Sequence, residues 1–304
     1  MKVRLILVPY DSGQREWRMG KGPAHLLRHG IASNVRAAGH TVAAEFVEHD
    51  HHVPSEVGSS FALYRTVSHR VRHSIEAGEL PVVLTGNCGA TLGVVAGLGD
   101  DPAVLWLDAH GDFNTPETTA SGFLDGMVLS ILTGRCWRTM AESIPDFSPL
   151  PEELAVLVGA RAIDDGEERE LALSEVRLVR AAEVRAAGVS ASLGSPLEAL
   201  ARQARRVHLH IDFDVLDPTQ VGRANAFAVE GGLTLAHLEE TIRLAASRFT
   251  IAGVTLSAYD PDYDHSGGIF RAAVRALELI TDVASTAHGI VGISTDQASP
   301  SRKR

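Results

Sequence analysis

Cysteine is scarce in this chain of 304 residues, which contains only Cys88 and Cys136. Two thiols cannot form a framework of disulfide bridges, and so low a content fits a protein of the reducing cytoplasm. Aromatic residues are also few, at 5%, and no apolar run approaches the ~20 residues that a membrane-spanning helix needs. We therefore expect a cytoplasmic protein that has no membrane segment.

Positive charge is in short supply as well. The chain has 28 lysines and arginines against 38 aspartates and glutamates, which gives a net charge of −10. A protein whose main partner is a nucleic acid needs basic side chains to neutralise phosphates, so this balance argues against that function. The partner that we expect is a small-molecule substrate, with homo-oligomerisation left open.

Short apolar runs alternate with longer segments of helical periodicity along the chain. The strand-like runs are residues 3–8, 81–84, 103–107, 154–158, 207–211, 251–256 and 289–293. The helical segments include residues 63–77, 195–206, 235–247 and 270–285. This alternation favours an α/β protein with a parallel sheet between layers of helices. Since no linker-like segment divides the chain, we expect one domain over residues 1–296 and a flexible tail over 297–304.

Three of the strand-like runs are followed by polar residues that could carry chemistry. Cys88 follows the run at 81–84, Asp108 follows the run at 103–107, and Asp212 follows the run at 207–211. In open parallel sheets, ligands bind beyond the carboxyl ends of the strands. All three segments are therefore expected to face one crevice.

The second and third of these segments are rich in metal-ligand side chains. Asp108, His110 and Asp112 are spaced by two residues, as are Asp212 and Asp214, which places each set on one side of an extended segment. Neighbouring carboxylates raise one another's pKa unless a cation lies between them. Oxygen ligands with one imidazole suit a divalent cation such as Mn²⁺. Five candidates exceed the needs of one ion, so we predict a dinuclear site with ions ~3.5–4 Å apart; aspartate turns at strand ends are the simpler alternative.

Two of these segments resemble signature motifs of the arginase/agmatinase/formiminoglutamase (ureohydrolase) superfamily. They read Asp-Ala-His-Gly-Asp at 108–112 and Asp-Phe-Asp-Val-Leu-Asp-Pro at 212–218, and the similarity extends from Gly-Lys-Gly-Pro at 20–23 to Tyr-Asp-Pro at 259–261. The resemblance implies a three-layer α/β/α fold around a mainly parallel eight-stranded sheet. It also implies a hydrolase of linear amidines, in which two metal ions activate a water that attacks a guanidinium or amidine carbon.

The resemblance further implies how the two ions are bound. One ion would take Cys88, Asp108, Asp112 and Asp212, and the other would take Asp108, His110, Asp212 and Asp214. Mn²⁺ is the metal that the family suggests. Cys88 replaces a family histidine, however, and a softer thiolate ligand shifts preference toward Fe²⁺, Co²⁺ or Zn²⁺. The alternative is that Cys88 is a small buried residue and that one metal is weakly bound or absent.

Two further departures from the family pattern concern the reacting end of the substrate. Asp125 stands where arginases have a proton-shuttling histidine, so it is the catalytic candidate, or else it caps the helix that begins near Gly126. Ala258 stands where the family has a glutamate that holds the guanidinium, and Thr255 replaces an aspartate. A buried guanidinium needs a partner for its charge, which weakens the case for plain arginine.

The residues that hold the amino-acid end resemble those of the family. Asn114 and Ser121 match positions that bind an α-carboxylate, and Asp164 matches one that binds an α-amino group. Together they favour an arginine-like amino acid, with N-hydroxy-L-arginine as the main hypothesis because it is less basic. L-Arginine is the alternative substrate, and a degenerate relative that only binds a metal or ligand is the alternative of another class.

Overall fold

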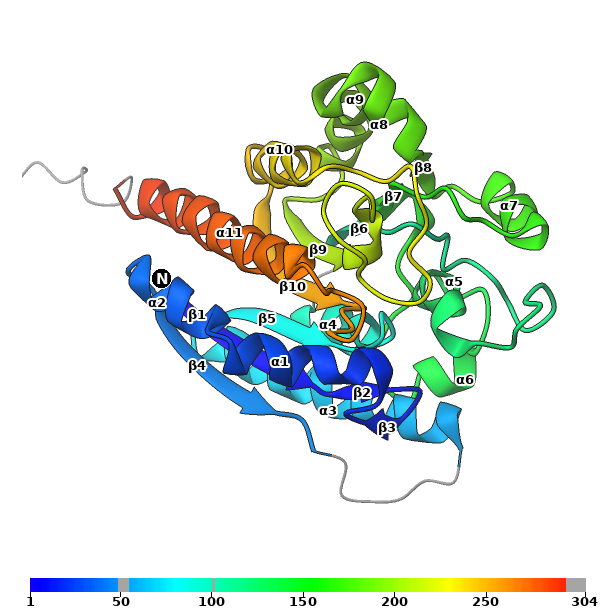
Figure 1. The fold of residues 1–304 in the computed structure, drawn as a ribbon, viewed down its shortest axis with the longest axis horizontal. Coiled ribbons are helices and arrows are strands. Elements are labelled where there is room, and N and C mark those ends of the chain that lie inside the picture. The colour runs from blue at the N-terminus through cyan, green and yellow to red at the C-terminus, as the bar shows by residue number, and fades with distance from the viewer. Residues whose placement is uncertain (49–54, 100–101, 294–304) are drawn as a thin grey trace, which may run out of the picture.

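The computed structural model describes residues 1–48, 55–99 and 102–293, with side chains up to residue 286 (Figure 1). Its centre is an eight-stranded parallel sheet in the order β4-β1-β5-β10-β9-β6-β7-β8. The strands are β1 (Lys2–Val8), β4 (Thr41–Phe46), β5 (Leu80–Thr85), β6 (Ala103–Leu107), β7 (Ala155–Val158), β8 (Arg177–Val179), β9 (Arg206–Asp212) and β10 (Thr250–Ser257). A separate antiparallel pair is formed by β2 (Tyr10–Asp11) and β3 (Gln14–Arg15).

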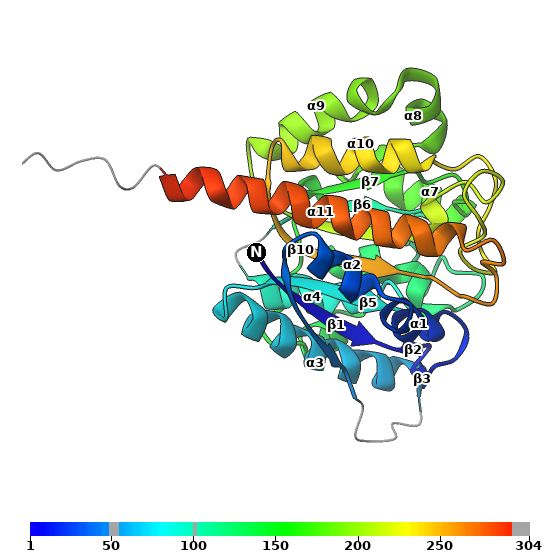
Figure 2. The same ribbon diagram turned by 60° about the vertical axis from the view of Figure 1, so that its left-hand side comes forward.

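Helices cover both faces of this sheet (Figure 2). Along one face, α11 packs beside α2 and α10, and along the other α4 packs beside α3 and α5. The helices are α1 (Gly22–Arg28), α2 (Ile31–Ala37), α3 (Glu56–Glu76), α4 (Ala90–Leu98), α5 (Val128–Leu132), α6 (Arg138–Ala141), α7 (Asp165–Ala172), α8 (Ala181–Ala187), α9 (Val189–Ala201), α10 (Leu235–Ala246) and α11 (Gly268–Ile293). Short 3₁₀ turns occur at Arg18–Lys21, Leu124–Met127, Glu152–Leu154 and Phe213–Val215.

The central strands are buried on both faces, as a parallel sheet between two helical layers requires. Every residue of β5, β6 and β7 is buried, and the sheet contacts α3 and α4 directly. Close approach of α3 and α4 depends on glycine. A Cβ at Gly93 would lie 2.2 Å from the Tyr64 carbonyl oxygen, and one at Gly97 would lie 2.5 Å from the Ser68 carbonyl oxygen. These glycines hold α4 against α3, and α4 begins beside the candidate site.

The predicted α/β fold with three layers is confirmed, although some element boundaries differ. Residues 289–293 were expected to be a strand but belong to α11, because a short apolar run alone does not distinguish a strand from a buried helical turn. The helix expected at 195–206 is α9, which ends at residue 201, before β9. The edge strands β4 and β8 were not predicted. Residues 297–304, the expected tail, lie outside the described part of the chain.

In that described part, no helix combines the length and apolar character needed to cross a membrane.

Candidate metal centre

Four neighbouring strands bring the predicted site residues together. β5, β10, β9 and β6 are adjacent in the sheet, and their carboxyl ends lead to Cys88, Ala258, Asp212 and Asp108 in that order. Asp212 pairs with Ser257 in the register of β9 and β10. Segments that are far apart in sequence therefore meet at one edge of the sheet, where open parallel sheets bind ligands.

One group of potential ligands contains Asp108, His110 and Asp214, whose ligand atoms lie within 4.8 Å of one another. His110 Nδ1 lies 3.4 Å from Asp108 Oδ1 and 3.4 Å from Asp214 Oδ2. Burial lowers the pKa of His110, but the carboxylates of Asp214 and Asp108 outweigh that effect and raise it to about 9. The imidazole is therefore held between two carboxylates.

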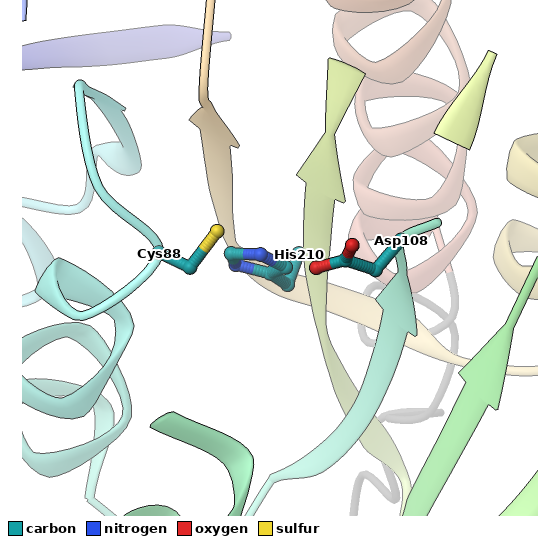
Figure 3. A group of neighbouring side chains, drawn as sticks. All are labelled: Cys88, Asp108 and His210. Carbon is teal, nitrogen blue, oxygen red and sulfur yellow. The ribbon is translucent and has the colours of Figure 1, made fainter. Parts of the chain in front are cut away.

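A second group contains Cys88, Asp108 and His210, again with ligand atoms within 4.8 Å of one another (Figure 3). The Cys88 thiol donates to Asp212 Oδ2 at 3.1 Å and lies 3.3 Å from Ser257 Oγ. Burial and the Asp212 carboxylate raise the pKa of Cys88 well above its usual value. The thiol is therefore protonated here, and it would become a thiolate ligand when a cation binds.

Asp112 and Asp212 lie near these groups but belong to neither. Burial and the neighbouring carboxylates, Asp108 first for Asp112 and Asp214 first for Asp212, raise the pKa of both side chains well above the ordinary range. Asp112 also has a left-handed backbone conformation, with φ of +49°, and its carbonyl oxygen accepts from the Leu129 amide at 2.8 Å. Such a conformation costs a non-glycine residue roughly 1–2 kcal/mol, so tertiary contacts must hold it.

This donor set fits divalent cations. Four aspartates are buried beside one another, namely Asp108, Asp112, Asp212 and Asp214. Their mutual repulsion would be relieved by positive charge placed among them. Oxygen donors with imidazole nitrogen and one sulfur are all recognised ligands of divalent transition metals. The predicted residues are therefore compatible with metal binding, and Asp108, which belongs to both ligand groups, is suited to serve two ions.

Asp125 is held by the start of helix α4. Its carboxylate accepts from the amides of Cys88 (3.1 Å) and Gly89 (2.9 Å) and from Asn87 Nδ2 (2.9 Å). Burial raises the pKa of Asp125 to about 7 despite these hydrogen bonds, which favour the charged form. The helix that Asp125 stabilises is thus α4 rather than the one beginning near Gly126, and its catalytic role stays a prediction.

A cavity of about 320 Å³ opens over these residues. Nine of the ten site residues predicted from sequence line it, and Asp108 lies buried beneath it. The nine are Cys88, His110, Asp112, Asn114, Ser121, Asp125, Asp164, Asp212 and Asp214. Asn114 Nδ2 donates to Asp164 Oδ2 at 3.2 Å. Two of the residues expected to bind the amino-acid end of the substrate are therefore hydrogen-bonded to each other. Polar groups for a substrate and ligands for metals therefore share one cavity.

The positions that differ from the family pattern have distinct surroundings. Ala258 lines the cavity and has a φ of +59°. Thr255 does not line it, because its side chain is buried against Thr91 (3.2 Å) and His208 (3.1 Å). The absence of a carboxylate at Ala258 therefore affects the cavity directly, whereas the replacement at Thr255 acts below the site.

Sequence reasoning overlooked several residues around the site. His210 shares the alternation of Asp212 along β9, a signal that could have identified it. Glu167 lines the cavity and accepts from the Phe113 amide at 2.7 Å. Asn225 Nδ2 donates to Asp214 Oδ2 at 3.3 Å. Glu167 lies in the first turn of α7, three residues after Asp164, a spacing typical of a helix N-terminus, whereas Asn225 comes from a loop that no local pattern marks.

Fold and site together define an α/β protein with a carboxylate-rich centre that is suited to two metal ions. A family model described as the arginase family matches residues 1–284. The arginase of Bacillus subtilis is 26% identical over 288 residues, which cover 91% of this chain and 96% of that protein. The N(omega)-hydroxy-L-arginine amidinohydrolase of Streptomyces lavendulae is 34% identical over 217 residues, covering 70% and 71%. A crystal structure of the Bacillus subtilis arginase superposes with a TM-score of 0.84 at 25% identity, covering 92% of this chain and 98% of that one.

The chain therefore belongs to the arginase family. This confirms the superfamily resemblance, the three-layer α/β/α arrangement and the prediction of a hydrolase that acts on amidine C–N bonds. Dependence on divalent metal, which the resemblance implies, agrees with the two ligand groups at the sheet edge.

Proposed function

We propose that this protein hydrolyses the terminal C–N bond of an arginine-like amino acid, with N-hydroxy-L-arginine as the preferred substrate. The observation that carries the proposal is the single cavity, which combines metal ligands, polar groups for an amino-acid head and an alanine at position 258. A relative that shares 34% of its residues is named for hydrolysis of that compound. L-Arginine is the second candidate, because the Bacillus subtilis relative is an arginase.

Metal binding is assigned to six residues in this proposal. One ion would be held by Cys88, Asp108, Asp112 and Asp212, and the other would be held by Asp108, His110, Asp212 and Asp214. When bound, two divalent ions would supply the Lewis acidity that activates a water molecule as the nucleophile. Mn²⁺ is the metal suggested by the family, whereas the thiolate of Cys88 favours Fe²⁺, Co²⁺ or Zn²⁺.

The chain's own residues bind and orient the substrate. Asn114 and Ser121 would contact the α-carboxylate, and Asp164 would contact the α-ammonium group. Because Asp164 already accepts a hydrogen bond from Asn114, the α-carboxylate and the α-ammonium group of the substrate would bind to two residues that are hydrogen-bonded to each other. Fixing that head sets how far the distal carbon reaches, and such positioning is a large part of catalysis.

Proton transfer to the departing nitrogen is assigned to Asp125. A carboxyl group with a pKa near 7 can donate a proton at neutral pH and recover it afterwards. Its hydrogen bonds from the Cys88 and Gly89 amides, just before α4, keep it at one place on the cavity wall. Asp125→Asn would therefore lower kcat more than it raises KM, because its side chain keeps one of the two acceptor oxygens that face the Cys88 and Gly89 amides but cannot exchange a proton.

The test is an assay of protein reconstituted separately with Mn²⁺, Fe²⁺, Co²⁺ or Zn²⁺. The value of kcat/KM would be measured for N-hydroxy-L-arginine, L-arginine and agmatine, with metal content determined for each preparation. The highest value is expected for N-hydroxy-L-arginine. Agmatine as the best substrate would contradict the amino-acid assignment, and L-arginine as the best would contradict the preference for the less basic group. Full metal loading without any turnover would indicate a non-catalytic relative.

A further inference from the structure

Strand β9 carries a second imidazole toward the metal centre. His208, His210 and Asp212 alternate along this strand and so face the same side of the sheet. His210 is completely buried, and its ring lies between the side chains of Cys88 and Asp108 (Figure 3). One nitrogen of His210, the Cys88 sulfur and an Asp108 oxygen all lie within 4.8 Å of one another.

Hydrogen bonds leave one ring nitrogen of His210 available. Its Nδ1 lies 2.8 Å from Thr91 Oγ1, and the Thr91 hydroxyl donates to Thr255 Oγ1 at 3.2 Å. Thr91 Oγ1 therefore accepts from Nδ1–H, so that Nε2 carries the lone pair. The contact of Nε2 with Ser257 Oγ is long, at 3.4 Å. Histidines that bind metals commonly have the other ring nitrogen held by a hydrogen bond in this way.

Trp106 orients both His210 and Asp108. Its ring stacks on the imidazole of His210, with centroids 3.7 Å apart and an interplanar angle of 19°. Its Nε1 donates to Asp108 Oδ2 at 3.1 Å. Trp106 and His210 are also paired in the register of β6 and β9. A single buried side chain thus fixes the plane of the imidazole and the direction of the carboxylate beside it.

We propose that His210 Nε2 is a metal ligand, which with Cys88 and Asp108 forms a sulfur–nitrogen–oxygen site on the inner side of the metal centre. Bonds of about 2.0–2.3 Å to one ion bring ligand atoms closer together than 4.8 Å, so small side-chain rotations would add His210 to the ligands proposed for that ion. The thiol proton, now donated to Asp212, is released when the ion binds. His210 thus supplies an imidazole in place of the family histidine that Cys88 replaces. The resulting site favours Zn²⁺ or Co²⁺ over Mn²⁺. It rests on the proposed function in one respect, namely that Cys88 and Asp108 belong to the metal centre.

The simpler role for His210 is that of a buried residue that only fills space and bonds Thr91. His208 provides a matched comparison, because it is equally buried, lies on the same face of β9 and also bonds a threonine hydroxyl, that of Thr255 (3.1 Å). It belongs to neither ligand group of the described residues. A structural role predicts similar effects for both histidines, and a ligand role predicts an effect on metal binding for His210 alone.

The first experiment titrates the metal-free protein with Co²⁺ and follows absorbance in the visible and near-ultraviolet. Wild type is expected to show thiolate-to-cobalt charge transfer and intense d–d bands. His210→Gln should bind one ion about 100-fold more weakly, which is the upper end of the cost of losing a residue that supports a metal ligand. It should also lose d–d intensity, and Cys88→Ser is expected to do the same. His208→Gln should keep the wild-type spectrum. Wild-type affinity and spectrum in His210→Gln would overturn the proposal.

A second measurement avoids dependence on a variant that could misfold. X-ray absorption at the zinc edge of the fully loaded wild-type protein counts the ligands directly. The expected result is one sulfur and two imidazoles per two ions, one from His110 and one from His210. One imidazole per two ions would overturn the proposal. Turnover is assayed separately on protein loaded with Mn²⁺, Fe²⁺, Co²⁺ or Zn²⁺, so that inactivity with all four metals together with the expected ligand count would contradict the proposed function while leaving the His210 ligand supported.

Discussion

Among the residues proposed to bind metal, Cys88 is the one whose side chain differs in chemistry from the family pattern. A thiolate is a softer ligand than an imidazole, so Cys88 should set metal preference. We expect Cys88→His to shift the ratio of affinities for Mn²⁺ and Zn²⁺ toward Mn²⁺. The ratio would be measured by competition titration of the metal-free protein with a chromophoric chelator.

Cys136 supplies the control for that substitution. It is buried and does not line the cavity, and burial raises its pKa to about 12, so that it remains a thiol. Cys136→Ser is expected to leave the affinity ratio unchanged. An identical ratio in Cys88→His and wild type would show that the thiol does not determine selectivity.

Ala258 leaves the cavity wall without a charge at the position that we propose faces the reacting end of the substrate. Losing one good charge-assisted contact costs about 1.5–3 kcal/mol, or roughly ten- to a hundred-fold in affinity. Ala258→Glu should therefore raise kcat/KM for L-arginine by about that factor, with a smaller gain for N-hydroxy-L-arginine. Because alanine and glutamate both carry a Cβ, the strain at φ +59° is similar in the two proteins.

The control for this variant is Ala258→Gln, which has nearly the same shape but no charge. Kinetics with both substrates would be compared at saturating metal. A similar rise in Ala258→Gln would mean that size rather than charge determines the effect. A loss of activity on L-arginine in Ala258→Glu alone would contradict the assigned orientation of the guanidinium.

At the scale of elements, central strands were more predictable than edge strands. β5, β6 and β9 are read directly from apolar runs because helices cover both their faces. β4, at the sheet edge, has one buried residue among exposed and half-buried ones, and β8 has only three residues, so neither produces a strong apolar signal. The run at 289–293 produced such a signal but continues α11.

Helix α7 provides an element-scale prediction about pH. Glu167, in its first turn, accepts from the amides of Phe113 (2.7 Å) and Asp164 (3.3 Å). Burial outweighs these hydrogen bonds and raises the pKa of Glu167 from 4.5 to about 7. Between those values the unfolded state loses its proton and the folded state keeps it. The contribution of Glu167 to the free energy of unfolding therefore falls as pH rises through this window, by about 1.4 kcal/mol per pKa unit, and is constant above it.

Glu167→Gln should remove this part of the pH dependence. Urea unfolding of the metal-free proteins at several pH values between 4.5 and 7.5 would measure it, with the variant showing the flatter profile. Glu168→Gln, next to it on the same helix but on the exposed side, is the control and should follow wild type. Parallel profiles for wild type and Glu167→Gln would contradict the assignment of the raised pKa to this group.

At the scale of the whole molecule, sequence could identify the candidate ligands that form local motifs. Spacing by two residues after an apolar strand marks Asp108 and Asp212 without reference to the rest of the chain. The contacts of Asp125 with the start of α4 depend on where another loop lies, as does the position of His210 between Cys88 and Asp108. Such neighbours follow from the order of strands in the sheet, which no local pattern specifies.

The buried carboxylates of the candidate metal centre lower the stability of the metal-free protein. Asp112 and Asp212 are buried with pKa values raised by burial and by neighbouring carboxylates. Their charged forms therefore oppose folding at neutral pH when no metal is present. Binding of metal to the folded state alone reverses that effect, and it adds about 2.7 kcal/mol at a free-metal concentration of 100 times Kd. The metal-free protein should consequently have a lower Tm than the metal-loaded one.

Asp212→Asn separates these two contributions. In the metal-free state, it should be as stable as wild type or more so, because it removes one of the repelling charges while an acceptor for the Asp214 amide is kept. Added Mn²⁺ or Zn²⁺ should then raise its Tm much less than that of wild type. Asp217 lies in the same segment, but its pKa is shifted in the opposite direction, because hydrogen bonds from Thr219 and Gly231 outweigh burial and lower it. Asp217→Asn should therefore destabilise the metal-free protein and keep the full response to metal. Thermal unfolding of wild type, Asp212→Asn and Asp217→Asn, after chelation and after reloading, measures both the Tm of the metal-free protein and the rise in Tm that metal causes. An Asp212→Asn protein that responds to metal like wild type would contradict the proposed role of Asp212 in binding both ions.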